Sequence, residues 1–456
     1  MDLKKGTEIE VEIQYLNISG RGVAKWNDYS IAVERLFPGD KAKISLAKIK
    51  KNYAEGDLVE LLEPSPLRTE PRSVHAHESG GSPWEVISYE NQLKFKQQEV
   101  ERILGNIEAD QAEIRQIIGM EDPWFYRNKM QYSFGYDENM NPTLGLHVAG
   151  RKFDVYDLQD CYLAEPWMAK VIEFFRRECF GHGLLPYRFK TGEHELRDLT
   201  IRTTKKTKQG MLIISVSSTA YFETIKKIVQ QAAEEIEEIQ SFWIEQVAIQ
   251  KGRRTERRLT HIAGPKTITE KLTVMGHELE FEIAPQSFFQ PNTLQAETIY
   301  NQVAKLADLQ GHETVYDLFC GTGTIGLSLS HLCKKVYGID LIKDAISNAN
   351  RNAQHNRIAN ATYVAGDIFK DFEKLNWHKA NLVVVDPPRA GLQPNLIEQI
   401  AKMDPKKIIY VSCNIKSFSR DLIEFREHGW RVKTVQPVDQ FPHTKHLELV
   451  SLLEKS

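Results

Sequence analysis

The sequence predicts an α/β protein whose C-terminal part is a doubly wound parallel sheet, preceded by a small β-barrel and a central α+β segment. Short alternating runs separated by Gly, Pro and Asp turns fill residues 1–63. Strand-like and amphipathic helical segments mix between residues 123 and 285. After residue 290, apolar strands alternate with helices, which is typical of a parallel sheet with helices on both faces.

The composition indicates an ordinary globular protein. The chain has 456 residues, 41% of them hydrophobic, and a formal net charge of −3, so we expect about two to four domains. It has no run of about 18 apolar residues and no signal-peptide pattern, and we therefore expect a cytoplasmic protein. The five cysteines are scattered and odd in number, which does not fit a disulfide framework.

Three basic clusters stand out against this nearly neutral charge: KAKISLAKIKK (41–51), TKKTK (204–208) and KGRRTERR (251–258). A run of charge is usually a solvated face. The clusters become candidate phosphate contacts only beside a site that needs a polyanion.

The first 63 residues favour a barrel because EIEVEIQYL, KAKISLAKI and similar runs alternate apolar and polar residues. Such barrels often bind single-stranded nucleic acid, although a fold alone does not establish a function. PSPLRTEP (64–71) has the composition of a linker. Residues 85–120 carry a helical period, and amphipathic helices such as EPWMAKVIEFFRREC follow in the central segment.

The first strand of the C-terminal sheet ends in DLFCGTGTIGL (317–327), where Gly321 and Gly323 belong to a G-x-G-x-x-G turn into a helix. Such a turn holds a dinucleotide or S-adenosylmethionine, or is only a tight turn. Asp340 ends the next strand, where a carboxylate can accept hydrogen bonds from both ribose hydroxyls. Asp367 ends the third strand, where an adenine amino group would lie.

The fourth and fifth strands narrow the choice of cofactor. Strand four ends in VVVDPPRAG (383–391), and a dinucleotide site needs no Asp-Pro-Pro there. Enzymes that methylate exocyclic amines follow a similar motif with an aromatic residue. Arg389 stands there instead, which disfavours amine methylation. Strand five ends in YVSCN (410–414) and places Cys413 at the same sheet edge, where we interpret it as a nucleophile rather than a small core residue.

Glu448 opens the last predicted strand, in DQFPHTKHLELV (439–450). A thiol and a carboxylate beside a methyl donor make a coherent reaction. Carbon 5 of uracil is a poor nucleophile, but a thiolate that adds to carbon 6 turns the ring into an enolate with charge at carbon 5. A base then removes the carbon 5 proton and the thiol leaves. Cys413 and Glu448 fit these two roles.

Together the motifs closely resemble those of the RNA uracil-5-methyltransferases, which make ribothymidine in ribosomal and transfer RNA. The resemblance covers nearly the whole chain and includes SFFQPN (287–292), DLFCGTGTIGL, DPPRAG, YVSCN and DQFPHTKHLE. It implies a Rossmann-like S-adenosylmethionine-dependent methyltransferase domain with Cys413 as nucleophile and Glu448 as base. It also implies cofactor contacts from Gln290, Phe319, Gly321, Gly323, Asp340, Asp367 and Asp386, of which Asp386 would orient either the cofactor or the uracil.

The same resemblance implies three domains. Residues 1–63 are similar to the TRAM domain, an RNA-binding OB-type barrel. Residues 64–84 and 123–285 would form a central α+β RNA-binding domain, and residues 85–122 and 286–456 the Rossmann-like catalytic domain.

Contacts to RNA are expected from three basic residues. FYRNKMQYSFG (125–135) matches a strand of the family that carries basic residues, here Arg127 and Lys129. Arg389 of the strand-four motif is the third. For the strand pair, a solvated edge is the alternative.

Several members of the family bind a four-iron cluster through C-x5-C-x2-C and a later cysteine. Ser73, Ser79 and Ser82 replace the first three ligands here, and Cys161 alone matches the fourth. An iron–sulfur cluster needs about four thiolates. We therefore predict neither an iron–sulfur cluster nor another metal site.

The loop around these serines has two other interpretations. His75, His77 and Cys161 could ligate zinc, but the His-x-His spacing is weak evidence. A loop held by serine hydrogen bonds and by packing of Trp84 is the simpler account.

We therefore expect a monomeric enzyme that methylates uracil carbon 5 in RNA. The barrel favours 23S ribosomal RNA over the tRNA T-loop, because the bacterial tRNA branch of the family typically lacks it. Two alternatives stay open. One is an RNA-folding factor without catalysis, which the intact Cys413 and Glu448 disfavour. The other is cytosine-5 methylation, whose RNA enzymes carry a cysteine where this chain has Pro388 and Arg389.

Overall fold

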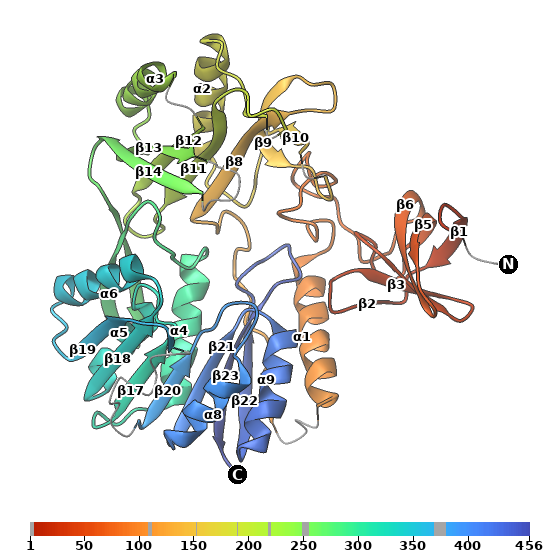
Figure 1. The fold of residues 1–456 in the computed structure, drawn as a ribbon. Helices are drawn as coiled ribbons and strands as arrows, with labels where there is room; N and C mark the ends of the chain where they lie inside the picture. Colours follow the sequence, from red (N-terminus) through yellow and green to blue (C-terminus); the bar gives the residue numbers. More distant parts are fainter. Residues whose placement is uncertain are drawn as a thin grey trace.

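The protein is described by a computed structural model with the α/β architecture expected from the sequence (Figure 1). The residues that the structure describes are 4–107, 112–151, 153–188, 190–217, 220–248, 255–368 and 380–456. The basic cluster 251–258 lies partly outside them. Among the described residues, no helix is long and apolar enough to cross a membrane.

A small curved sheet forms the N-terminal barrel, which stands apart from the main body in Figure 1. Its order is β1-β5-β6-β4-β3-β2, and β1 also packs against β3. Alternate residues of β5 are buried, as the alternating sequence predicts. The strands are β1 (Glu8–Glu12), β2 (Tyr15–Leu16), β3 (Gly22–Trp26), β4 (Tyr29–Val33), β5 (Lys41–Ile49) and β6 (Tyr53–Glu63).

The central part of the chain forms a second sheet, with order β10-β9-β8-β11-β12-β13-β14. Helices α2 (Trp167–Gly181) and α3 (Phe222–Glu235) pack against it through one apolar core. The strands are β8 (Lys129–Tyr136), β9 (Pro142–His147), β10 (Val155–Asp157), β11 (Leu196–Thr203), β12 (Gly210–Val216), β13 (Ser241–Ala248) and β14 (Glu256–Ala263).

A hairpin of β15 (Ile268–Val274) and β16 (His277–Ile283) follows. Its buried side chains join the apolar core around helices α4 (Thr293–Ala307) and α6 (Lys343–His355) of the C-terminal part. The hairpin thus connects the central sheet to the C-terminal layer, and the exact domain boundaries stay a prediction.

The C-terminal sheet has the order β19-β18-β17-β20-β21-β23-β22-β7. The pairs from β19 to β21 are parallel, and β23 is antiparallel to both of its neighbours. The strands are β7 (Glu113–Ile114), β17 (Thr314–Leu318), β18 (Lys335–Asp340), β19 (Ala361–Ala365), β20 (Leu382–Val385), β21 (Lys407–Ser412), β22 (Trp430–Val438) and β23 (Glu448–Lys455).

Helices cover both faces of this sheet because its central strands are apolar on both sides. Leu382 and Val384 face the core that contains α4, α5 (Thr324–Leu329) and α6. Val383 and Val385 face the opposite core. That core contains α1 (Tyr89–Gly105), α8 (Pro394–Lys402) and α9 (Ile415–Glu427). Helix α1 therefore packs on the C-terminal sheet, although it precedes the central sheet in the chain (Figure 1).

Candidate active site

Strand register places Cys413 and Glu448 side by side. Ser412, the last residue of β21, pairs with Leu449 of the antiparallel β23. The next position along β21 is Cys413, and the preceding position along β23 is Glu448. Cys413 is partly exposed, whereas only 4% of Glu448 is exposed. The predicted nucleophile and base therefore meet at the carboxyl edge of the parallel strands, where ligands of such sheets bind.

The electrostatics of this pair also involve Asp386 and Arg389. Burial, followed by the carboxylates of Glu448 and Asp386, raises the pKa of Cys413 to about 11, against the effect of Arg389. Burial, together with Asp386, raises the pKa of Glu448 well above its usual range. Burial also raises the pKa of Asp386 to about 7. A thiol beside carboxyl groups of raised pKa is suited to proton transfer between them.

The loop that carries Arg389 is held from beneath by Asp421 of α9. The buried Asp421 carboxylate accepts hydrogen bonds from the Leu392 N–H and the Tyr410 hydroxyl, both at 2.7 Å. Gly391 has a φ of +78°, and a Cβ there would lie 2.5 Å from this carboxylate, so the turn requires glycine. The loop therefore presents Arg389 from a fixed backbone.

Arg389 lies against His446, two residues before Glu448. Its Nη2 donates to His446 Nδ1 at 3.1 Å. Burial, followed by the surrounding cations Arg389, Lys445, Lys96 and Arg127, lowers the pKa of His446 to about 4. Positive charge thus gathers beside the predicted nucleophile Cys413 and base Glu448, here called the catalytic pair.

The glycine turn is built from backbone that bends into the left-handed region. Phe319, Gly321 and Gly323 have φ values of +65°, +54° and +79°. A Cβ at Gly321 would meet nothing within 4 Å, so the space above this turn is open. Asp340 fixes the turn because its Oδ2 accepts from the Gly321 N–H at 3.0 Å and its Oδ1 from the Ile342 N–H at 2.8 Å. An open backbone cradle beside a strand-end carboxylate fits the ribose and amino-acid parts of S-adenosylmethionine.

Asp317, which opens the glycine motif, was not among the predicted site residues. It is fully buried, and its Oδ2 accepts from the Gly326 N–H at 2.9 Å. A Cβ at Gly326 would lie 2.8 Å from that oxygen. Burial, followed by the nearby Asp386 and Asp340, raises the pKa of Asp317 to about 8. An acidic residue inside an otherwise apolar strand was the sequence signal for it.

Two further predicted cofactor residues, Asp367 and Gln290, come from outside this turn. Asp367 follows β19 by two residues and is partly exposed. The Gln290 Oε1 accepts from Gln440 Nε2 at 3.2 Å, and the Gln290 backbone oxygen accepts from Asn128 Nδ2 at 2.7 Å. Gln290 therefore contacts the segment that leads to Glu448.

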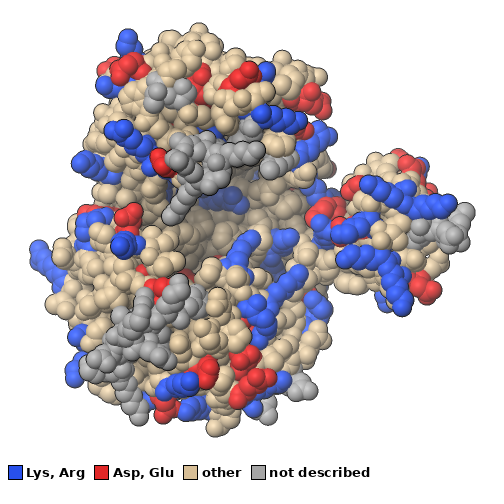
Figure 2. Space-filling model, viewed as in Figure 1, with Lys and Arg blue, Asp and Glu red and all other residues tan. Residues whose placement is uncertain are grey.

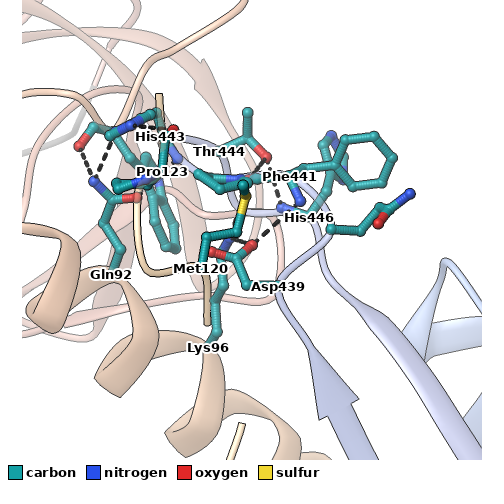
Figure 3. Close-up of polar contacts among 12 residues, drawn as sticks. Gln92, Lys96, Met120, Pro123, Asp439, Phe441, His443, Thr444 and His446 are labelled. Carbon is teal, nitrogen blue, oxygen red and sulfur yellow. Dashed lines mark hydrogen bonds and ion pairs between the residues drawn. The ribbon is translucent and has the colours of Figure 1, made fainter. Parts of the chain in front are cut away.

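Residues 439–447, here called the catalytic loop, are anchored to α1 by a buried ion pair (Figure 3). The Lys96 ammonium donates to Asp439 Oδ1 at 2.6 Å and to the Phe441 carbonyl at 3.1 Å. Both charged side chains are at most 1% exposed. The Tyr89 hydroxyl donates to the other Asp439 oxygen at 2.8 Å. Helix α1 thus fixes the start of the catalytic loop.

His443 fixes the middle of the catalytic loop (Figure 3). The backbone N–H of His443 donates to Gln92 Oε1 at 2.8 Å, and the ring Nδ1 of His443 lies 3.2 Å from Gln92 Nε2. Its Nε2 lies 3.1 Å from the Pro123 carbonyl, and its ring stacks on Trp124 at 3.8 Å. Burial lowers the pKa of His443 to about 3, so the imidazole is neutral with its proton on Nε2. Asp439 and His443 were not among the predicted site residues. The DQFPHTKHLE motif contains both and could have indicated them, but it gives no indication of their partners on α1.

Arg127 and Lys129 lie at a separate pocket of about 360 Å³, which Gly80 and Gly81 also line. Arg127 Nη2 donates to the Gly81 carbonyl at 3.2 Å. Lys129 is exposed at the start of β8. The two residues share this pocket rather than the immediate surroundings of Cys413, while Arg127 still acts electrostatically on His446.

The three serines that replace family cysteines take part in hydrogen bonds. Ser73 Oγ donates to Asp160 Oδ1 at 2.5 Å, and Ser82 Oγ donates to Glu85 Oε2 at 3.0 Å. Ser79 Oγ accepts from the Gly81 N–H at 3.1 Å. This agrees with a loop held by serine hydrogen bonds.

One of the possible zinc ligands, His75, is engaged elsewhere. Nδ1 of His75 lies 3.0 Å from Glu78 Oε2, and its Nε2 accepts from the Gln159 N–H at 3.0 Å. Within the described part of the chain, no group of three or more His, Cys, Asp or Glu side chains could hold a metal ion.

Comparisons with known proteins identify the family. The sequence model of the tRNA (uracil-5-)-methyltransferase family matches residues 204–456, and that of the TRAM domain matches residues 2–59. Proteins described as uncharacterized RNA methyltransferases are similar over the whole chain. One from Caldanaerobacter subterraneus is 36% identical over 100% of both chains. One from Enterococcus faecalis is 35% identical over 100% of this chain and 98% of the other.

A solved structure shares the fold. The tRNA (uracil-54, C5)-methyltransferase of Pyrococcus abyssi, in complex with S-adenosyl-L-homocysteine, is 25% identical. It covers 98% of this chain and 100% of its own, with a TM-score of 0.77. Because the family model spans more than half of the chain and the relatives span all of it, this protein belongs to the tRNA (uracil-5-)-methyltransferase family and is an S-adenosylmethionine-dependent RNA methyltransferase with an N-terminal TRAM domain.

Proposed function

We propose that this enzyme methylates carbon 5 of a uracil in RNA through a covalent adduct between Cys413 and carbon 6 of the ring. The observation that carries the proposal is the pairing of β21 with β23, which puts Cys413 beside Glu448 at the sheet edge that carries the glycine turn. Neither residue has a structural reason to stand at this edge, because a half-open thiol and a buried carboxyl group contribute little to packing there.

The protein groups would act in sequence. The sulfur of Cys413 forms a bond to carbon 6 and gives its proton to the carboxylate of Asp386, which returns that proton when the thiol leaves. S-adenosylmethionine, when bound at the glycine turn, supplies the methyl group that carbon 5 receives. Glu448 then takes the proton from carbon 5, and the bond between sulfur and carbon 6 breaks to restore the thiol. The target base must leave its stack to reach this buried edge.

Two classes of RNA compete as the substrate. The barrel led us to favour 23S ribosomal RNA. However, the Pyrococcus abyssi tRNA enzyme aligns with 98% of this chain, and the alignment therefore includes most of the 63-residue N-terminal segment. The barrel therefore does not exclude tRNA, which is the second candidate.

Release of tritium from RNA labelled at uracil carbon 5 tests both the reaction and the substrate. Ribosomal and transfer RNA would be assayed separately with S-adenosylmethionine. We expect release from one of them, its loss in Cys413→Ala, and its retention in Cys161→Ala, a matched cysteine variant in the central part of the chain. Binding of S-adenosylhomocysteine, measured by calorimetry, should be unchanged in both variants. If neither RNA releases tritium although this ligand binds, the proposed reaction is wrong.

A further inference from the structure

A second pocket, of about 440 Å³, lies where the barrel meets helix α1. The barrel contributes Tyr15, Leu16 and Asn17, and α1 contributes Asn91 and Lys94. The volume lies within the range of roughly 300–1,000 Å³ found for small-ligand sites. In Figure 1, β2 of the barrel faces α1 across this junction.

This pocket, here called the junction pocket, adjoins the catalytic pair. Ile415 and Leu447 also line it. Ile415 lies two residues after Cys413, and Leu447 immediately precedes Glu448. A ligand in the junction pocket therefore contacts the two chain segments that carry Cys413 and Glu448.

The walls of the junction pocket are fastened to one another. Lys445 of the catalytic loop donates through Nζ to the Ser19 carbonyl of the barrel at 2.6 Å. The Trp84 ring meets Phe37 of the barrel and Phe95 of α1 edge-on, at 6.3 and 6.4 Å between ring centroids. The pocket is thus formed before a ligand arrives, which reduces the entropic cost of binding.

The charge around the junction pocket suits a polyanion. Lys445 lies within the electrostatic range of the cations Arg21, Lys416 and Arg389 and of one carboxylate, that of Glu34, which pairs with Arg21. Lys94 is exposed at the rim. Figure 2 shows Lys and Arg side chains on the barrel and on the neighbouring face of the main body. Cations in such a group can follow the phosphates of a nucleic acid strand.

The lining combines groups that single-stranded RNA needs. Tyr15 is 44% exposed and offers an aromatic face. Asn17 Oδ1 and Asn91 Nδ2 already make hydrogen bonds within the chain, so the atoms that can meet base edges are Asn17 Nδ2 and Asn91 Oδ1. We propose that the junction pocket binds an unpaired nucleotide that flanks the reacting uracil, with its base stacked on Tyr15 and its phosphate beside Lys94. The proposal rests on the proposed function in taking RNA as the ligand, and it assigns the barrel a defined role in placing the target.

Binding of a fluorescent single-stranded oligouridylate to the full-length protein, saturated with S-adenosylhomocysteine, tests the stacking contact. We expect Tyr15→Ala to weaken binding by about 5- to 160-fold, because stacking of one base on an aromatic ring contributes about 1–3 kcal/mol. Tyr15→Phe should retain the affinity. Tyr221→Ala is the matched control, since Tyr221 is 48% exposed at the start of α3, and it should bind like the unmodified protein.

The phosphate contact has its own measurement. Lys94→Gln should reduce the slope of log affinity against log salt concentration by about 0.7, the value for one single-strand phosphate contact. Lys227→Gln, an exposed lysine variant on α3, should leave the slope unchanged. RNA that contains 4-thiouridine should crosslink to peptides with Tyr15 or Lys94.

Equal affinity of Tyr15→Ala and the unmodified protein would overturn the proposal, and so would crosslinks that avoid both peptides. These measurements do not depend on methyl transfer. Loss of binding in Tyr15→Ala without any tritium release would reject the proposed reaction and retain the junction pocket. Tritium release from RNA, together with full binding by Tyr15→Ala, would support the proposed reaction and reject the junction pocket.

Discussion

The cofactor half and the catalytic half of the site are built in different ways. In the cofactor half, the supporting hydrogen bonds join residues close in sequence: Gly321 and Asp340 are 19 positions apart, and Asp317 and Gly326 are 9 apart. In the catalytic half, Lys96 and Asp439 are 343 positions apart. The first half is a local turn between consecutive strands, whereas the second exists only after α1 has packed on the far end of the sheet.

Because of this difference, cofactor binding and methyl transfer should respond to different substitutions. A substitution near Gly321 should change cofactor affinity and leave Cys413 and Glu448 in place. A substitution on α1 should displace the catalytic loop and leave the glycine turn intact. Variants that affect both halves equally would show that the two are one cooperative unit.

The largest effect is expected from Glu448→Gln. Glutamine keeps the shape of the side chain but cannot accept the carbon 5 proton, so methylated RNA should stay bonded to Cys413. General-base loss typically lowers a rate by about 10²- to 10⁴-fold. We expect this reduction in tritium release, together with an RNA–protein adduct that survives denaturing electrophoresis. A variant that releases tritium at the normal rate would show that another group is the base.

Lys96→Met should have the next largest effect. It leaves the buried Asp439 carboxylate without its ammonium partner, and breaking a buried ion pair in this way costs about 3–5 kcal/mol. We expect the melting midpoint of the catalytic domain to fall by about 10 °C and methyl transfer to fall with it. Affinity for S-adenosylhomocysteine at a temperature below the transition should change little.

Two variants make the Lys96 test specific. Lys227→Met removes an exposed helical lysine and should leave the melting midpoint unchanged. The double variant Lys96→Met/Asp439→Leu removes both buried charges, and it should recover much of the stability without recovering activity. Full activity in the double variant would show that the ion pair stabilises the fold but does not position the catalytic loop.

Asp340→Asn should act on the cofactor half alone. The amide group cannot accept hydrogen bonds from both the Gly321 N–H and a ribose as the carboxylate can. Hydrogen bonds to charged groups contribute about 1.5–3 kcal/mol, so affinity for S-adenosylhomocysteine should fall by about 10- to 100-fold in calorimetry. Asp344→Asn, an exposed residue of α6, is the control. Unchanged affinity in Asp340→Asn would place the ribose elsewhere.

The cofactor half of the site could be predicted from sequence because its residues lie close together in the chain. The G-x-G-x-x-G turn, Asp340 and the strand alternation after residue 290 occupy one continuous stretch, and the observed order of β17, β18 and β19 follows from the right-handed crossovers of parallel strands. The resemblance to the family extended this to Cys413 and Glu448, whose adjacency the register then showed.

The supports of the catalytic loop could not be predicted in the same way. Nothing in the sequence of α1 shows that Lys96 would be buried, since lysine is normally exposed and the helical period alone places it on one face without naming its partner. Asp317 could have been found, because an acidic residue inside an apolar strand must be satisfied by a nearby donor. Contacts such as that between Arg389 and His446 depend on two loops whose meeting is set by tertiary packing.

The smallest expected effect concerns the reactivity of Cys413 and tests how Glu448 and Arg389 act on it. Because its pKa is raised to about 11, alkylation by iodoacetamide should accelerate about tenfold per pH unit from about pH 7 to about pH 9 as the thiolate fraction grows.

In Glu448→Gln the neighbouring negative charge is absent, so the pKa of Cys413 should fall and its alkylation should be faster at equal pH. This difference should widen as the pH rises, because the raised pKa of Glu448 keeps its carboxyl group partly protonated at lower pH. Arg389→Gln should shift the profile the other way, since Arg389 stabilises the thiolate. Mass spectrometry of the Cys413 peptide, with the Cys161 peptide as an internal reference, measures all three profiles; identical profiles would mean that neither charged residue acts on the nucleophile.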